Sequence, residues 1–168
     1  MPKAAIVMGS DSDLEALKPA FRILKEFDIE VQARVISAHR TPDAAHAFSK
    51  HAADDGIEVI IAAAGKAAHL AGVLAAYTPL PVIGIPIQSS TMDGLDSLLS
   101  TVQMPAGIPV ATVAINGAQN AALLAVQILS LRYGYLQQKM IEYKKNMAND
   151  VIKKDKKLQN GLQALLDD

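Results

Sequence analysis

Residues suited to proton transfer on an anion lie side by side in the segment Ser37-Ala38-His39-Arg40-Thr41-Pro42. The imidazole of His39 can exchange a proton near neutral pH, and the guanidinium of Arg40 can donate paired hydrogen bonds to a phosphate or carboxylate. Thr41 followed by Pro42 is typical of a capped helix start. The segment predicts acid–base chemistry just before a helix; an ordinary surface loop remains the alternative.

A second polar segment, Gly9-Ser10-Asp11-Ser12-Asp13, follows a short apolar run. Backbone N–H groups at a helix start, together with the hydroxyls of Ser10 and Ser12, can bind an anion, although the same residues are also preferred helix caps. Asp13 would repel a phosphate, so sugar hydroxyls suit it better. No glycine-rich dinucleotide or nucleoside-triphosphate pattern is present, which argues against those ligands.

Two further segments, 64–69 and 86–90, have the same character of a polar loop after an apolar run. In the first, His69 is either a second polar group for a ligand or a residue of a helix start, and Lys66 either contacts an anion or points to solvent. His46 and His51 are five residues apart on one expected helix, so they cannot share a metal ion as an i, i+4 pair does. We predict no metal site.

The elements that would position these loops alternate between short β-branched runs and longer segments rich in alanine and leucine, which is typical of a parallel sheet covered by helices. We expect strands at 4–8, 31–36, 58–62, 82–85 and 110–114, and helices at 13–26, 42–54, 68–75, 91–101 and 117–131. The predicted fold class is α/β, a three-layer, doubly wound, flavodoxin-like sheet. Ligands bind outside the carboxyl ends of such strands, so the four loops should face one cleft.

Composition fits a folded domain and excludes several partners. Of the 168 residues, 51% are hydrophobic, and 16 basic side chains nearly balance 17 acidic ones, so neither nucleic acid nor an anionic membrane is attracted in general. There is no cysteine, which makes the cytoplasm the default expectation. The most apolar stretch, 57–76, contains charged residues and two glycines, and we expect no membrane span there.

The chain divides into an expected α/β catalytic domain at 1–132 and a helical extension at 133–168. In the extension, Leu136, Met140, Tyr143 and Met147 recur at spacings of three to four residues, as on one face of an amphipathic helix. That face would pack on the core or on a neighbouring subunit; a solvated tail is the alternative.

Other activities of this fold class lack their residues. A phosphate-accepting regulatory domain needs an aspartate where the third strand ends, but this position has Ala62, Ala63 and Ala64. Aromatic residues, which stack on flavins, make up only 4% of the chain, and there is no cysteine nucleophile. A nucleotide-binding or regulatory module without turnover, or a structural assembly subunit, remains open.

The loop motifs resemble one family closely. These are Met8-Gly9-Ser10-Asp11-Ser12-Asp13, Ser37-Ala38-His39-Arg40-Thr41-Pro42, Ala67-Ala68-His69-Leu70, and the stretch from Leu95-Asp96-Ser97 through Gln103-Met104-Pro105 to Asn120-Ala121-Ala122. Together they resemble the N5-carboxyaminoimidazole ribonucleotide mutase family over roughly residues 4–131. One departure is Lys66, where many mutases have glycine.

The resemblance implies a cofactor-free isomerisation in purine biosynthesis that moves a carboxyl group from the exocyclic nitrogen to C4 of an imidazole ribonucleotide, through carbon dioxide. It makes His39 the catalytic acid and base, and it places Ser10, Asp13 and Arg40 at the ribose phosphate. It assigns the pocket lining to Ser12, Ser37, Ala38, Gly65, Ala68, His69 and Leu70.

The resemblance also implies a homo-octamer whose tails reach neighbouring subunits. A second branch of the family is a carboxylase that uses aminoimidazole ribonucleotide and free carbon dioxide, and it differs in the loop after the third strand. Here that loop keeps the pattern Ala67-Ala68-His69-Leu70, which favours the mutase.

Overall fold

In the computed structural model, which describes residues 1–166, a five-stranded parallel sheet forms the centre of the molecule. The strands are β1 (Lys3–Met8), β2 (Glu30–Val35), β3 (Val59–Gly65), β4 (Val82–Ile87) and β5 (Ala111–Thr112). They pair in the order β2-β1-β3-β4-β5. This is the flavodoxin-like order, in which the chain direction across the sheet reverses between β1 and β3 and opens a crevice there. The predicted fold class is confirmed.

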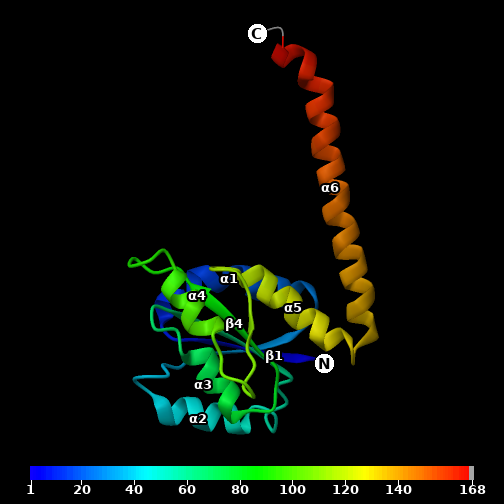
Figure 1. Ribbon diagram of the computed structural model, residues 1–168. Helices are drawn as coiled ribbons and strands as arrows, with labels where there is room; N and C mark the ends of the chain where they lie inside the picture. Colours follow the sequence, from blue (N-terminus) through cyan, green and yellow to red (C-terminus); the bar gives the residue numbers. More distant parts are fainter. Residues whose placement is uncertain (167–168) are drawn as a thin grey trace.

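Helices cover both faces of the sheet, which makes three layers (Figure 1). They are a single turn at Asp11–Asp13, then α1 (Leu14–Glu26), α2 (Pro42–His51), α3 (Leu70–Tyr77), α4 (Leu95–Val102), α5 (Ala118–Ser130) and α6 (Gly134–Leu166). Alternate residues of β1 enter the two cores: Ile6 packs with α1 and α5, and Val7 with α2 and α3. Burial on both faces explains why the central strands β1, β3 and β4 are almost wholly apolar, whereas the edge strand β2 (EVQARV) is largely exposed and contains three polar residues.

Three predicted elements differ from the structure. β3 runs to Gly65, beyond the expected end at 62, because Ala63, Ala64 and Gly65 continue to pair with β4. The strand expected at 110–114 pairs only at Ala111–Thr112. The helix expected from 91 begins at Leu95, since left-handed backbone at Asp93 (φ 51°) and Gly94 (φ 96°) cannot belong to an α-helix. The other predicted ends lie within three residues of the observed ones.

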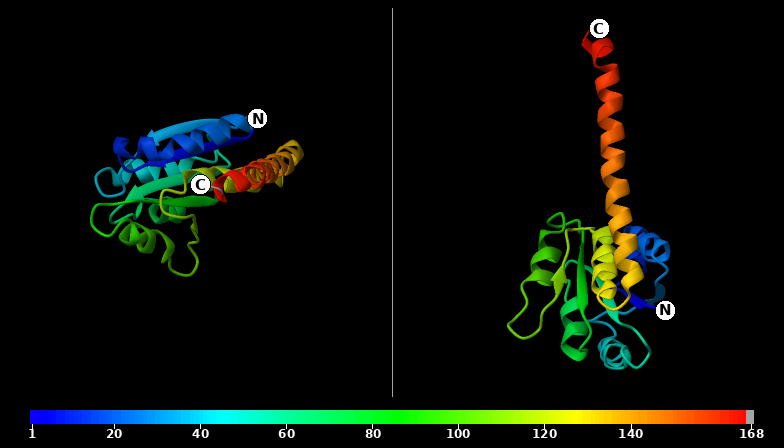
Figure 2. Two further views of the ribbon diagram at one scale, coloured as in Figure 1. Left: turned by 90° about the horizontal axis from the view of Figure 1, so that it is seen from above. Right: turned by 90° about the vertical axis from the view of Figure 1, so that its right-hand side faces the viewer.

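The 33-residue helix α6 starts on the core and then leaves it (Figures 1 and 2). Leu136 and Met140 are buried in the cluster that contains α1 and α5, and the ring of Tyr143 lies 5.8 Å from that of Phe27. Met147 is 53% exposed, and residues 144–160 are exposed throughout. The predicted apolar face is therefore half covered by the core of the same chain. Residues 167–168 of the predicted extension lie outside the described residues.

Within residues 1–166, no helix combines the length and the apolar character needed to cross a bilayer.

Candidate active site

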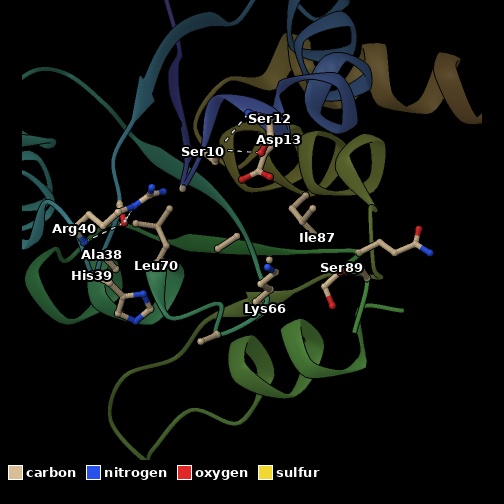
Figure 3. Close-up of a pocket in the computed structure, with 17 residues that line it drawn as sticks. Ser10, Ser12, Asp13, Ala38, His39, Arg40, Lys66, Leu70, Ile87 and Ser89 are labelled. Carbon is tan, nitrogen blue, oxygen red and sulfur yellow. Dashed lines mark hydrogen bonds between the residues drawn. The ribbon is translucent and has the colours of Figure 1, made fainter. Parts of the chain in front are cut away.

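A pocket of about 710 Å³ opens at the carboxyl ends of β1, β2, β3 and β4 (Figure 3). It is where parallel strands direct the loops that follow them. Its wall contains all of the predicted site residues except two: Ser10, Ser12, Asp13, Ser37, Ala38, His39, Arg40, Gly65 and Leu70. Four separate loops thus converge on one cavity.

Hydrogen bonds between Ser37 and Thr41 join the two ends of the loop between β2 and α2. The hydroxyl of Thr41 donates to the carbonyl of Ser37 (3.0 Å) and accepts from the amide of Ser37 (3.0 Å). The amide of Arg40 in turn donates to the hydroxyl of Ser37 (3.1 Å). Thr41 occupies the N-cap position as predicted, but its side chain makes no bond to a helix amide, so the expected cap is wrong in this detail. The hydroxyl instead fixes the loop that carries His39 and Arg40.

His39 makes a direct contact with the second histidine of the predicted site. Nε2 of His39 lies 2.9 Å from Nδ1 of His69, and the rings meet edge to face with centroids 5.0 Å apart. One nitrogen must donate and the other must accept, so the bond persists only while one of these two facing nitrogens carries no proton. The bond to His69 thereby limits both the orientation of the His39 ring and which of its nitrogens can carry a proton.

The structure places Ala68 and His69 differently from the pocket-lining positions expected for them. Ala68 is 1% exposed and lies beneath the loop, where its carbonyl accepts from the hydroxyl of Thr101 (3.5 Å). His69 borders a neighbouring cavity of about 510 Å³ between α3 and α4. Its link to the main pocket is the hydrogen bond to His39.

The loop after β1 caps a helical turn and also borders the pocket. The hydroxyl of Ser10 caps the short turn by accepting from the amide of Ser12 (3.3 Å), and it also accepts from the hydroxyl of Ser12 (2.9 Å). Both serines still border the pocket. Asp13 follows, and burial raises the pKa of its carboxyl above the usual range, against the lowering effect of hydrogen bonds from Ser10 and Ser12.

Lys66 and a group of residues after β4 complete the wall. Lys66 has a left-handed backbone (φ 57°), a conformation that costs a residue with a side chain about 1–2 kcal/mol and glycine little. Gln88, Ser89 and Ser90 also line the pocket. The backbone amide of Gln88 donates to the side-chain oxygen of Asn116 (3.0 Å). The hydroxyl of Ser89 donates to the carboxylate of Asp96 (2.9 Å). The sequence identified this loop, but no residue in it was assigned to a ligand.

No metal centre is evident in the part of the chain that the structure describes, because no three His, Asp or Glu side chains there lie close enough to share an ion.

The sequence profile of the family described as "AIR carboxylase" matches residues 3–150, which is most of the chain. The chain belongs to the AIR carboxylase family. A member from Pyrococcus abyssi, named N5-carboxyaminoimidazole ribonucleotide mutase, is 58% identical over 147 residues, covering 88% of this chain and 84% of that protein. A member of the same name from Saccharolobus solfataricus is 57% identical over 152 residues, covering 90% of this chain and 96% of that protein.

A solved structure of the family, titled "Crystal structure of Treponema denticola PurE", superposes with a TM-score of 0.86 at 31% identity. The match covers 94% of this chain and 99% of that one. The resemblance noted in the loop motifs is therefore confirmed at the level of the family and of the fold.

Proposed function

We propose that the protein is the isomerase that converts N5-carboxyaminoimidazole ribonucleotide to 4-carboxy-5-aminoimidazole ribonucleotide in purine biosynthesis. The observation that carries the proposal is a single pocket that combines an oriented imidazole, His39, with donors for an anion on the loops after β1 and β2. The names of the relatives agree with this reaction.

In the proposed complex, Arg40, Ser10 and Ser12 donate to the phosphate, and the carboxyl of Asp13 accepts from the ribose hydroxyls. Arg40 suits the phosphate because its guanidinium can donate two parallel hydrogen bonds. Asp13 suits hydroxyls because a carboxylate beside a phosphate would be repelled. The ring of the substrate then extends toward His39.

The carboxyl group moves in two balanced steps. The bond between the exocyclic nitrogen and the carboxyl carbon breaks, carbon dioxide leaves, and the electron pair left on nitrogen takes a proton from His39. C4 of the ring then attacks carbon dioxide, and His39 takes back the proton from C4, which restores the aromatic ring. No cofactor is needed, because one imidazole supplies and recovers the same number of protons.

The released carbon dioxide must be kept beside the ring. Ala38, Leu70 and Ile87 give the pocket an apolar section of wall, which favours a dry site. Water there would compete for the carboxyl group and open a route for carbon dioxide to escape.

The rate of product formation with purified protein, without ATP and without added metal, tests the proposal. We expect fast conversion of the N5-carboxylated nucleotide and slow conversion of aminoimidazole ribonucleotide with bicarbonate. Preference for the second mixture would identify the carboxylase instead. Turnover of neither would contradict both enzymes and leave a binding module.

A pair of histidine variants tests the role of His39. We expect His39→Asn to lower kcat by about 10²–10⁴-fold, the usual contribution of general acid–base catalysis, while nucleotide binding stays within a few fold. His51→Asn is the matched control, because His51 is an exposed histidine on α2 outside the pocket. Equal loss in both variants would contradict the role of His39.

We also propose that the chain acts in the cytoplasm as a homo-oligomer, an octamer by the resemblance. Beyond the core, α6 continues its apolar face with Met147, Val151, Leu158 and Leu162, all exposed in the single chain. An exposed apolar stripe of this length is typical of a surface that binds another protein. A second copy is the occupant that the resemblance implies.

Light scattering at tens of micromolar should then give a mass near eight times 17.8 kDa. Leu158→Lys, on the stripe, should reduce that mass, whereas Asn146→Lys adds the same charge to an exposed position off the stripe and should not. A wild-type mass of 17.8 kDa would contradict the assembly.

A further inference from the structure

Lys66 places a cation on the pocket wall that no described residue of the chain neutralises. Its side chain borders the cavity, and among residues 1–166 its ammonium makes no hydrogen bond or ion pair. Lys3, Lys18, Lys139 and Lys153 each pair with a carboxylate, whereas Lys25 and Lys50 resemble Lys66 in making no ion pair among the described residues; Lys66 differs from these two in bordering the pocket. The free charge of Lys66 is thus available to a ligand.

The backbone at Lys66 is held in the conformation that favours glycine. Its φ of 57° is left-handed, and its carbonyl closes a tight turn by accepting from the amide of Ala68 (2.8 Å). A lysine in this conformation is strained, and strained residues concentrate where a side chain is needed at a functional site. The strain and the unpaired charge are independent observations on the same residue.

The charges of the pocket match a ligand with two anionic groups. Arg40 and Lys66 are the cations of its described wall, and Asp13 is the carboxylate. The proposed function assigns the phosphate to Arg40 and to Ser10 and Ser12. The carboxyl group of the substrate is a second anion, and it has no cation assigned to it.

Lys66 lies on the same loop as the histidine that contacts His39. It comes three residues before His69, which contacts His39, so the same loop carries the cation and the partner of the proposed acid. Figure 3 shows His39 beside Arg40 at one end of the cavity, Ser10, Ser12 and Asp13 along another wall, and Lys66 on the wall between them. Because the proposed function assigns the phosphate to Arg40, Ser10 and Ser12, Lys66 is the cation of the described wall that remains for the carboxyl group.

From this geometry we infer that Lys66 binds the carboxylate of the N-carboxylated substrate and of the C-carboxylated product. The inference rests on the proposed function. The ammonium favours the two states that carry a carboxylate, and it gains little from neutral carbon dioxide between them. Such an interaction lowers KM and does not accelerate the chemical steps.

Removing the charge of Lys66 should weaken the binding of a nucleotide that has the carboxyl group and not that of the nucleotide that lacks it. In Lys66→Met, we expect binding of 4-carboxy-5-aminoimidazole ribonucleotide to weaken about tenfold, the scale of one charge-assisted hydrogen bond, and binding of aminoimidazole ribonucleotide to change less than twofold. KM for the N5-carboxylated substrate should rise and kcat should not fall, because the lost interaction stabilises the bound substrate more than the carbon dioxide state that follows it. Lys66→Arg should keep the preference, and Lys50→Met, an exposed lysine on α2 outside the pocket, should change neither affinity.

Titration calorimetry with both nucleotides measures the preference without turnover. Equal weakening of both nucleotides in Lys66→Met would overturn the inference, because Lys66 would then contact their shared phosphate or ribose. No weakening of either would also overturn it. In both cases turnover by the wild-type protein would leave the proposed function standing, whereas a wild-type protein that neither binds nor converts the nucleotides would contradict the proposed function and this inference with it.

Discussion

The start of α6 should contribute as much to folding as an element of the sheet core, and Leu136→Ala tests this. Leu136 is 0% exposed and belongs to the cluster formed with α1 and α5. Truncating a fully buried leucine removes its transfer free energy and leaves a cavity, which together cost about 2–5 kcal/mol. We expect about 3 kcal/mol, a large share of the roughly 5–15 kcal/mol that stabilises a typical domain.

Urea unfolding, followed by circular dichroism at a fixed protein concentration, measures the loss. Ile141→Ala is the matched control, because Ile141 lies one residue beyond Met140 on the same helix and is 57% exposed. An exposed substitution of this kind should change the free energy of unfolding by no more than about 0.5 kcal/mol. Repeating both titrations at a tenfold lower protein concentration separates folding from assembly, since assembly makes the midpoint concentration-dependent.

Equal midpoints for Leu136→Ala and Ile141→Ala would refute the reasoning, because the buried leucine would then have no more effect than an exposed isoleucine. A loss confined to high protein concentration would also refute it. The leucine would in that case stabilise contacts between chains and not the core of one chain.

Three further outcomes are expected. His69→Phe removes the hydrogen bond to His39 and should lower kcat about tenfold with KM little changed, while His46→Phe, outside the pocket, should leave kcat unchanged; an unaltered kcat in His69→Phe would contradict a positioning role. Burial raises the pKa of Asp13. The ionised carboxyl therefore destabilises the folded state at pH values above that pKa, and this cost disappears below the unfolded value of about 3.9. In urea titrations Asp13→Asn should be more stable than wild type at pH 7, and the difference in stability should shrink as the pH falls to about 4. Lys66→Gly should have a higher urea midpoint than Lys66→Ala, with a free energy of unfolding larger by about 1 kcal/mol, because only glycine adopts the left-handed φ without strain. Equal midpoints would show that the backbone there is not strained.

The fold was predictable because the central strands of a parallel sheet are buried on both faces and are therefore apolar at nearly every position, as in the run from Ala4 to Met8, even though the edge strand β2 is largely exposed. The start of α4 was predicted less accurately. The run expected to be helical from 91 contains Asp93-Gly94, and both residues have left-handed backbone. Asp-Gly is a dipeptide typical of turns, so a later start of this helix could have been predicted from the sequence.

The site was predictable to the level of loops and not of contacts. Strand ends mark which loops meet, so His39, Arg40 and Ser10 converge as their positions require. The direction of a side chain within a loop depends on packing from other elements. The resemblance implies a pocket-lining position for Ala68, but Ala68 is buried beneath the loop, where its carbonyl accepts from the hydroxyl of Thr101 of α4, 33 positions away.

The bond between His39 and His69 restricts which nitrogen can act on a ligand. While Nε2 of His39 is engaged with His69, only Nδ1 of His39 is free to exchange a proton. If catalysis uses Nδ1, His69 holds the ring in place, and its removal lowers kcat. If catalysis uses Nε2, the bond must break in every turnover, and its removal raises kcat. The direction of the change in His69→Phe therefore identifies the reacting nitrogen, and a decrease would assign proton transfer to Nδ1 with His69 as the residue that orients it.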